Sequence, residues 1–437
     1  MNSGPELYRR ARRRIPGGTQ LLSKRPEMFL PDQWPSYYSW AKGAVVADLD
    51  GKTYIDMSIS GVGACLLGYA DDDVNEAARK AVDAGSMCTL NAPEEVELAD
   101  LLCELHPWAE MVRYARCGGE AMSVGVRIAR AASGRDLVAF CGYHGWTDWY
   151  LSANLNSDEA LIGHLMPGLE PKGVPKGLTG TAIPFRYNRV DELQAIVEAN
   201  PGRLGAIVME PLREREPEDG FLEKVREIAD KTGAVLVMDE VSMGWRLTVG
   251  GAHMKYGVTP DIAVFAKAIS NGHPMAAIIG KARVMEAAQN TFISSTYWTD
   301  RVGPAAALAT IRKLRQHRVP EYLAEIGNRV KQGWTRTAER AGLNVTVSGL
   351  AQLPRFALNY PNAQAARTLF TQMMLERGYL ATNSLYVTFA HQPSHVDAYL
   401  AACEESFREL AKALGCGSVE AQLKGPVAHA GFHRLTS

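Results

Sequence analysis

Three apolar runs of the sequence end in side chains that are able to do chemistry. The run AVLVMD (234–239) ends in Asp239, the run DIAVFA (261–266) is followed at once by Lys267, and the run AIVME (206–210) ends in Glu210. A lysine beside a buried strand is partly desolvated, which favours the neutral amine that attacks carbonyl groups. A carboxylate at the end of a parallel strand can pair with a buried cation, and the protonated nitrogen of a pyridine ring is one such cation.

Lys267 and Asp239 on separate strands together predict a pyridoxal phosphate site. That cofactor uses an amine for its aldehyde and a carboxylate for its ring nitrogen. Each residue alone also has a plain structural interpretation, because Lys267 could end a strand and Asp239 could cap the next segment.

A cradle for the phosphate is expected where the sequence RCGGE (116–120) turns from a strand into a helix. Gly118 and Gly119 leave backbone N–H groups accessible there, and a helix N-terminus favours an anion. Tyr143 follows the strand LVAFC (137–141), so its ring could stack on a flat cofactor. As isolated features, the glycine pair also fits an ordinary turn, and Tyr143 fits an ordinary packing residue.

A sheet is needed to bring these residues together. Apolar runs alternate with helical periods from about residue 70 to 310, and several runs are apolar throughout, as in strands buried on both faces. The predicted strands are 111–115, 137–141, 206–210, 234–239, 261–266 and 276–280, and the predicted helices are 118–132 and 221–233. This alternation predicts right-handed crossovers and a mostly parallel sheet, whose ligands bind at the carboxyl ends of the strands.

The two ends of the chain have a different pattern. Residues 40–60 contain two short strands around the turn Asp50-Gly51, and LYVTFA (385–390) is predicted to be a strand among long amphipathic helices. We therefore predict an α/β fold with a smaller α+β domain made from both chain ends. The predicted parts are an N-terminal segment at 1–69, a large domain at 70–310 and a C-terminal part at 311–437.

Composition argues against several classes of protein. The 437 residues carry 47 Lys+Arg against 48 Asp+Glu, a balance that is unusual for a dedicated nucleic-acid binder. No apolar run reaches the roughly 18 residues of a membrane span, and the basic N-terminus lacks the apolar segment of a secretory signal. The seven cysteines form no C-x-x-C pair and the ten histidines form no metal set, so we expect no metal site and a reducing, cytoplasmic location. The stretch GVGACL (61–66) lacks the last glycine of the dinucleotide fingerprint, so no NAD site is predicted.

Longer segments of the chain resemble the signature of the class III aminotransferases, in particular the branch of glutamate-1-semialdehyde 2,1-aminomutase. They are VLVMDEVSMGWR (235–246), GGAHMKYGVTPDIAVFAKAISNG (250–272) and SSTYWTDRVGPAAALAT (294–310). Shorter matches are IPGGTQ (15–20), AKGAVVADLDGKTYIDM (41–57), CGGEAMSVGVRIARAASGRD (117–136) and GYHGW (142–146). The likeness covers nearly the whole chain, and the order and spacing of the segments are specific.

This resemblance implies a fold-type-I homodimer that uses pyridoxal 5′-phosphate and shares its active sites at the subunit interface. It implies that Lys267 binds the cofactor covalently, that Asp239 keeps the pyridine nitrogen protonated, and that Tyr143 and Val241 lie on opposite faces of the ring. It also implies that Gly118 and Gly119 belong to the phosphate loop and that Thr296 reaches the phosphate from the partner subunit. Glu210, at the end of its strand, is placed among the cofactor contacts as well.

Departures from the family pattern concern the substrate. Cys117 stands where the phosphate loop usually has a serine, and the aminomutase's carboxylate-binding arginine has only Lys24 or Arg25 as a candidate replacement. The resemblance therefore favours an aminotransferase that moves an amino group from an amino acid, with glutamate as the first candidate, to an aldehyde or ketone of a polar acceptor. A sugar-derived acceptor is the first guess, and an intramolecular 2,1-aminomutase is the alternative. The side chains expected to shape the substrate pocket, each of which also suits plain packing, are His144, Trp146, Trp149, Tyr150, Tyr297, Trp298 and Arg301.

Overall fold

The computed structural model describes all residues except 1–2, 158, 165–169, 213–214 and 431–437. The chain forms two compact units: unit 1 comprises Met1–Asp71 and Glu321–Ser437, and unit 2 comprises Asp72–Pro320. Both boundaries lie later in the chain than the predicted ones at 69 and 310. The second boundary lies later because the helix α9 (Val302–Gln316) packs on α2 (Asp72–Asp83) inside unit 2, so residue 310 falls in the middle of an element.

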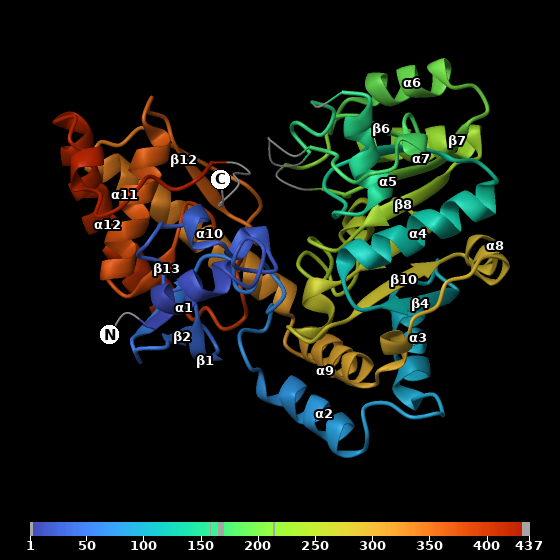
Figure 1. The fold of residues 1–437 in the computed structure, drawn as a ribbon, viewed down its shortest axis with the longest axis horizontal. Helices are drawn as coiled ribbons and strands as arrows, with labels where there is room; N and C mark the ends of the chain where they lie inside the picture. The colour runs from blue at the N-terminus through green and yellow to red at the C-terminus, as the bar shows by residue number, and fades with distance from the viewer. Residues whose placement is uncertain (1–2, 158, 165–169, 213–214, 431–437) are drawn as a thin grey trace. The chain divides into compact units, whose positions relative to one another are not determined.

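Unit 2 is built on a seven-stranded sheet with the order β4-β10-β9-β8-β7-β5-β6 (Figure 1). Its strands are β4 (Met111–Ala115), β5 (Leu137–Cys141), β6 (Ala182–Pro184), β7 (Leu204–Met209), β8 (Val235–Asp239), β9 (Ile262–Phe265) and β10 (Ala276–Gly280). Only β10 runs antiparallel to its two neighbours, β4 and β9, while β6, β5, β7, β8 and β9 pair in parallel. The prediction of a mostly parallel sheet is confirmed, although the short strand β6 was not predicted.

Helices cover both faces of this sheet. The remaining α-helices of unit 2 are α3 (Pro93–Leu105), α4 (Gly118–Ser133), α5 (Asp148–Leu151), α6 (Val190–Ala199), α7 (Phe221–Thr232) and α8 (Ala282–Met285). Side chains of α4 pack with Val208 of β7, Val237 of β8 and Val264 of β9. In each of these strands every second residue points to this face. The intervening residues point to the other face, where α7 packs on β7 and β8. Both faces of the sheet are therefore buried, which explains why these strands are apolar throughout.

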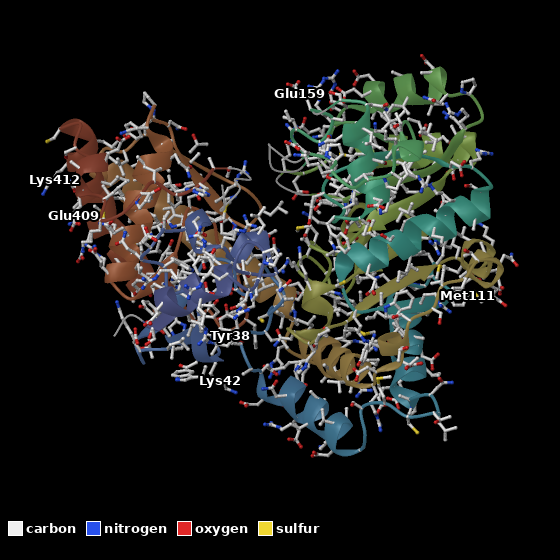
Figure 2. The ribbon with its side chains drawn as sticks, in the orientation of Figure 1. Tyr38, Lys42, Met111, Glu159, Glu409 and Lys412 are labelled. Atoms are coloured by element: carbon white, nitrogen blue, oxygen red, sulfur yellow. The ribbon has the colours of Figure 1, made fainter. Side chains whose placement is uncertain are left out.

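Unit 1 joins the two ends of the chain in one sheet with the order β1-β2-β3-β13. Its strands are β1 (Tyr38–Lys42), β2 (Val45–Asp48), β3 (Thr53–Met57) and β13 (Tyr379–Ala381), beside a separate hairpin of β11 (Val345–Ser348) and β12 (Arg355–Leu358). The long helices are α1 (Ser3–Arg12), α10 (Val319–Ala341), α11 (Ala363–Glu376) and α12 (Pro393–Gly415). Tyr38 and Lys42, labelled in Figure 2, are the first and last residues of the edge strand β1.

Two local predictions for unit 1 have opposite outcomes. The hairpin around Asp50-Gly51 is confirmed, because β2 and β3 pair antiparallel and Asp48 Oδ1 accepts the N–H groups of Asp50 and Lys52. The predicted strand at 385–390 is wrong. Its backbone N–H groups divide among three segments of unit 1 rather than pairing with one strand. Leu385 and Val387 donate to the carbonyls of Pro354 and Gln352, Tyr386 donates to Ser58, and Phe389 donates to Leu66.

Candidate functional site

Asp239 is a buried carboxylate at the carboxyl end of β8. Its Oδ1 accepts the Val241 N–H at 2.9 Å, and its Oδ2 lies 2.7 Å from His144 Nδ1. The other ring nitrogen, Nε2, lies 3.2 Å from the Cys141 carbonyl oxygen. The imidazole ring is therefore held between the Cys141 carbonyl on one side and the Asp239 carboxylate on the other. The pair thus joins a fixed carboxylate to a ring whose orientation is set from both sides.

His144, which was predicted either to shape the substrate pocket or to be a packing residue, lies buried beside Asp239. Its side chain is fully buried, and the indole ring of Trp149 stacks on it with an interplanar angle of 23°. Trp149 and Tyr150 are buried as well, and both belong to the core cluster that includes α4. These three aromatic side chains therefore support the site from within the core.

Lys267 follows β9 and begins the short 3-10 helix η6 (Lys267–Ser270). Its backbone has a φ of +48°, a left-handed conformation that costs free energy for a residue with a side chain. The amine Nζ donates a hydrogen bond to Ser242 Oγ at 2.7 Å. Sequence reasoning missed Ser242, and no spacing rule would have found it, because the contact joins segments that are 25 residues apart.

The loop that carries Tyr143 is held from three directions. The buried Glu210 accepts the Tyr143 N–H at 3.1 Å, while His164 Nδ1 accepts the Gly142 N–H at 3.1 Å. The Tyr150 hydroxyl donates to the Gly142 carbonyl at 3.0 Å. The Tyr143 side chain itself is 38% exposed. Glu210, predicted to contact a cofactor, here fixes the backbone of the residue whose ring is accessible.

Glycines bring the start of α4 close to two other loops. A Cβ on Gly118 would lie 2.8 Å from Val241 Cγ1, and a Cβ on Gly119 would lie 3.3 Å from the Trp146 ring. Gly145, with a φ of +103°, approaches so closely that its Cβ would lie 2.9 Å from the Gly119 Cα. The tertiary structure thus gathers residues from three predicted motifs around the N-terminus of α4.

The first backbone bond of α4 runs from the Ala121 N–H to the Cys117 carbonyl. The N–H groups of Gly118, Gly119 and Glu120 precede this bond, as the first N–H groups of a helix do, and they can bind an anion. Burial raises the pKa of the Cys117 thiol, which is also 3.7 Å from the Glu120 carboxylate. A thiol that stays protonated adds no negative charge to this end of the helix.

These residues fit pyridoxal 5′-phosphate. The start of α4 offers backbone donors for a phosphate, Asp239 offers a buried carboxylate for a pyridinium, and Lys267 offers the amine. Tyr143 presents an accessible ring, and Val241 lies against the glycine cradle. When bound, the cofactor supplies an electron sink for chemistry at the carbon that bears the amino group.

A buried polar network lies directly after Asp239 in the chain. Glu240 accepts the backbone N–H groups of Ala252 and His253, each at 2.9 Å, and its Oε1 lies 2.7 Å from His253 Nδ1. The opposite nitrogen of His253 accepts the Trp108 indole N–H, so the proton of the ring is on Nδ1 and is donated to Glu240. The network fixes the segment that carries Val241 and Ser242.

The remaining predicted substrate residues of unit 2 are found in different settings. Trp146 and Tyr297 are each 71% exposed, whereas Trp298 packs partly buried against the core cluster. Arg301 forms an ion pair with Glu94, and although burial alone would raise the pKa of that carboxyl, the Arg301 hydrogen bond holds it below its ordinary value. Thr296 is exposed at the start of the 3-10 helix η8 (Thr296–Thr299).

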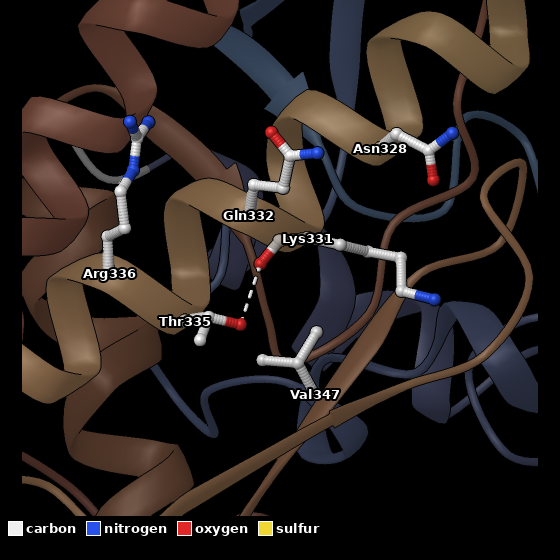
Figure 3. Close-up of a pocket in the computed structure, with 6 residues that line it drawn as sticks. All are labelled: Asn328, Lys331, Gln332, Thr335, Arg336 and Val347. Carbon is white, nitrogen blue, oxygen red and sulfur yellow. Dashed lines mark hydrogen bonds between the residues drawn. The ribbon is translucent and has the colours of Figure 1, made fainter.

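Lys24 and Arg25 belong to unit 1, so their predicted contact with the substrate stays a prediction. Lys24 ends the 3-10 helix η1 (Leu22–Lys24) and is exposed, and Arg25 is half-buried. Unit 1 also has a surface pocket, lined by Asn328, Lys331, Gln332, Thr335 and Arg336 of α10 and by Val347 of β11 (Figure 3). The Thr335 hydroxyl donates to the Lys331 carbonyl there. None of the predicted site residues lines this pocket.

In the part of the chain that the structure describes, no three His, Cys, Asp or Glu side chains are grouped as metal ligands would be. Within the same residues, we find no helix with the length and apolarity needed to span a membrane.

The chain is similar to known proteins over most of its length. The model of the aminotransferase class-III family matches residues 31–384. The chain is 30% identical over 421 residues to a 3-aminobutyryl-CoA aminotransferase of Cloacimonas acidaminovorans, a match that covers 93% of this chain and 97% of that protein. It is 33% identical over 426 residues to a glutamate-1-semialdehyde 2,1-aminomutase of Syntrophobacter fumaroxidans, with 92% and 96% covered. Its fold matches the pyridoxal-phosphate form of the FumI protein of Sphingopyxis sp. MTA144 with a TM-score of 0.85 and 25% identity, over 94% and 97% of the two chains.

Proposed function

Because the chain belongs to the class-III aminotransferase family, whose members use pyridoxal 5′-phosphate, we propose that it moves an amino group from an amino acid to the aldehyde or ketone of a polar acceptor. Glutamate is the first donor to test, and a sugar-derived carbonyl compound is the first acceptor. The relative that acts on a 3-aminobutyryl-CoA substrate adds short acyl-CoA carbonyl compounds to the acceptors worth testing.

The observation that carries this proposal is that Asp239 ends β8 and Lys267 follows the neighbouring parallel strand β9. Asp239 would hold a proton on the pyridine nitrogen of the cofactor, and its burial would keep water from competing for that proton. Lys267 would hold the cofactor through its amine, and when that amine is free it would take up and return the proton at the donor's Cα. Tyr143, with its backbone held by Glu210, would stack on the cofactor ring.

The reaction needs a second subunit in this proposal, because Thr296 would reach the phosphate from the partner. Several large apolar side chains of unit 2 are exposed in the single chain, as an interface would require: Leu90 at 78%, Phe292 at 85% and Tyr297 at 71%. The test is to mix two inactive variants and measure how much activity returns. Lys267→Ala and Thr296→Ala subunits should each be poorly active alone, whereas mixing them after mild dissociation should restore about a quarter of the wild-type activity. No gain on mixing would contradict a shared site.

An intramolecular 2,1-aminomutase is the second candidate, since the chain is 33% identical to one such enzyme over almost its full length. The two candidates differ in what they consume. An aminotransferase uses one donor molecule per product, whereas an aminomutase isomerises its substrate without net use of a donor.

The deciding experiment uses purified full-length protein loaded with pyridoxal phosphate. The wild type should be yellow, borohydride should fix the cofactor to a peptide that contains Lys267, and Lys267→Ala should lose that linkage. A set of carbonyl acceptors is then offered to the protein after it has been charged with glutamate, while 2-oxoglutarate release is measured. Product formation coupled to 2-oxoglutarate supports the aminotransferase, and isomerisation of glutamate-1-semialdehyde without added donor supports the aminomutase. A protein that fails to bind the cofactor overturns the proposal.

A further inference from the structure

Ser242 contacts the reactive nitrogen of the site, although no part of the proposed chemistry has used it. Its hydroxyl oxygen accepts the hydrogen bond of Lys267 Nζ at 2.7 Å. The two residues come from segments that follow neighbouring strands, β8 and β9, so the bond spans the edge of the sheet at which Asp239 also ends.

The backbone of Ser242 is held firmly. Its carbonyl oxygen accepts the Arg246 Nε–H at 2.8 Å, and the Gly244 N–H donates to the Glu240 carbonyl at 2.8 Å. The Glu240 N–H in turn donates to the Val264 carbonyl of β9, also at 2.8 Å. Because the Glu240 side chain is fixed by the buried bonds to Ala252 and His253, the whole turn that carries Ser242 is preorganised.

Lys267 approaches this fixed hydroxyl from a strained backbone. Its φ of +48° is unusual for a residue with a side chain and needs support from the surrounding structure. A flexible lysine has several rotatable bonds, and a hydrogen bond to a rigid partner selects one position for its amine. Both the strain and the rigid acceptor determine where the nitrogen lies.

We propose that Ser242 is the positioning residue of the Lys267 amine. It accepts an N–H of the amine while the amine is not bonded to cofactor, and so returns the nitrogen to one place for each proton transfer. The proton that leaves the substrate carbon moves to Nζ and from Nζ back to carbon, and the serine hydroxyl remains intact throughout. This inference rests on the role proposed above for Lys267.

The test compares Ser242→Ala and Ser242→Thr with the wild type in the full-length protein. Loss of this hydrogen bond should slow exchange of the donor's Cα hydrogen with D₂O, measured without any acceptor, about tenfold. The donor KM should change by less than about twofold, because the substrate itself is not contacted in this proposal. Ser242→Thr keeps the hydroxyl and should recover most of the rate.

A second readout does not depend on turnover. After the cofactor has been stripped, the rate of covalent capture of added pyridoxal phosphate, fixed with borohydride and read by mass spectrometry, should fall severalfold in Ser242→Ala. A matched control is Ser406→Ala, which removes the buried hydroxyl that contacts Met374 Sδ in unit 1 and should leave both rates unchanged.

The outcomes separate this inference from the proposed function. Wild-type rates in Ser242→Ala, in a protein whose wild type is active, would overturn the role of Ser242 alone, as would a Ser242→Thr variant as slow as Ser242→Ala. A wild type that captures no pyridoxal phosphate would overturn both proposals.

Discussion

Two buried aspartates stand at opposite ends of neighbouring parallel strands in unit 2. Asp239 ends β8, whereas Asp261 comes directly before β9, at the other edge of the sheet. They are 3% and 1% exposed, so burial does not distinguish them. Their hydrogen-bond partners do, because Asp239 is bonded to one ring and one N–H group, whereas Asp261 is surrounded by cations.

The carboxylate of Asp261 is saturated by its own chain. Oδ2 accepts from Arg226 Nη1 at 2.9 Å and from the Leu236 N–H at 3.0 Å, while Oδ1 accepts from Lys281 Nζ at 3.0 Å and is also paired with Arg283. Burial alone would raise the pKa of this carboxyl, but the Leu236 N–H and these cations hold it below its ordinary value. The bonds tie α7, β8, β9 and the segment after β10 together, so Asp261 serves stability.

Asp239 is less completely paired, which suits a carboxylate that has to bind a cofactor. If Asp239 acts as proposed, the same residue type, equally buried, serves the fold where the chain supplies its partners and serves chemistry where a ligand supplies one.

Replacing Asp239 should lower activity more than stability. Asp239→Ala should lower the rate of the donor half-reaction roughly a thousandfold, because the positive charge on the pyridine nitrogen would lose its carboxylate. Stopped-flow absorbance of the loaded protein measures this rate, and urea unfolding of the same samples measures stability. A variant that loses stability but keeps its rate would reverse the assignment of the two aspartates.

Replacing Asp261 should have the opposite signature. Asp261→Ala leaves Arg226 and Lys281 without their shared acceptor and should lower the free energy of unfolding by about 3 kcal/mol. The rate per folded molecule should stay within about twofold of the wild type. A matched control is Glu227→Ala, which removes an exposed ion pair with Lys231 and should cost less than about 0.5 kcal/mol. Equal losses in the two variants would contradict the role of Asp261.

Replacing His144 tests whether its contact with Asp239 supports the proposed role of that carboxylate. His144→Phe removes the nitrogen that contacts Asp239 Oδ2 and should slow the donor half-reaction by about tenfold to a hundredfold, since Asp239 would lose its partner. His144→Asn keeps a donor near the position of Nδ1 and should be less impaired. The rate of the donor half-reaction is measured over a range of pH. A purely structural role of His144 would lower stability without changing the pH dependence of this rate.

The smallest effect concerns the acid dependence of stability. The pKa of Asp261 in the folded protein lies below its ordinary value of 3.8, so its stabilisation is complete above about pH 4 and is lost as the pH falls through the folded pKa. The difference in unfolding free energy between the wild type and Asp261→Asn should therefore be constant from pH 7 to pH 5 and shrink at lower pH. Isothermal urea titrations at each pH would show it, and a difference that grows on acidification would be inconsistent with this account.

Much of this arrangement was predictable before any coordinates, and for identifiable reasons. Continuous apolar runs predict strands that are buried on both faces. A reactive residue at the end of such a run must lie at the edge of the sheet, and this pattern identified Lys267 and Asp239. The predicted boundary at residue 310 falls inside α9, because helical periodicity does not say which unit a helix packs on. The run at 385–390 is apolar because Leu385 and Val387 are buried, and burial alone does not provide a neighbouring strand.

The amino-acid sequence by itself determined the family, the mostly parallel sheet and the residues that end its strands, because these follow from local patterns and from motifs of fixed spacing. Only the tertiary structure decided that His144 supports Asp239, that Glu210 holds the Tyr143 loop and that Ser242 receives the Lys267 amine. Those contacts join segments 25 to 95 residues apart, and their directions depend on how strands and loops pack, which no local pattern encodes.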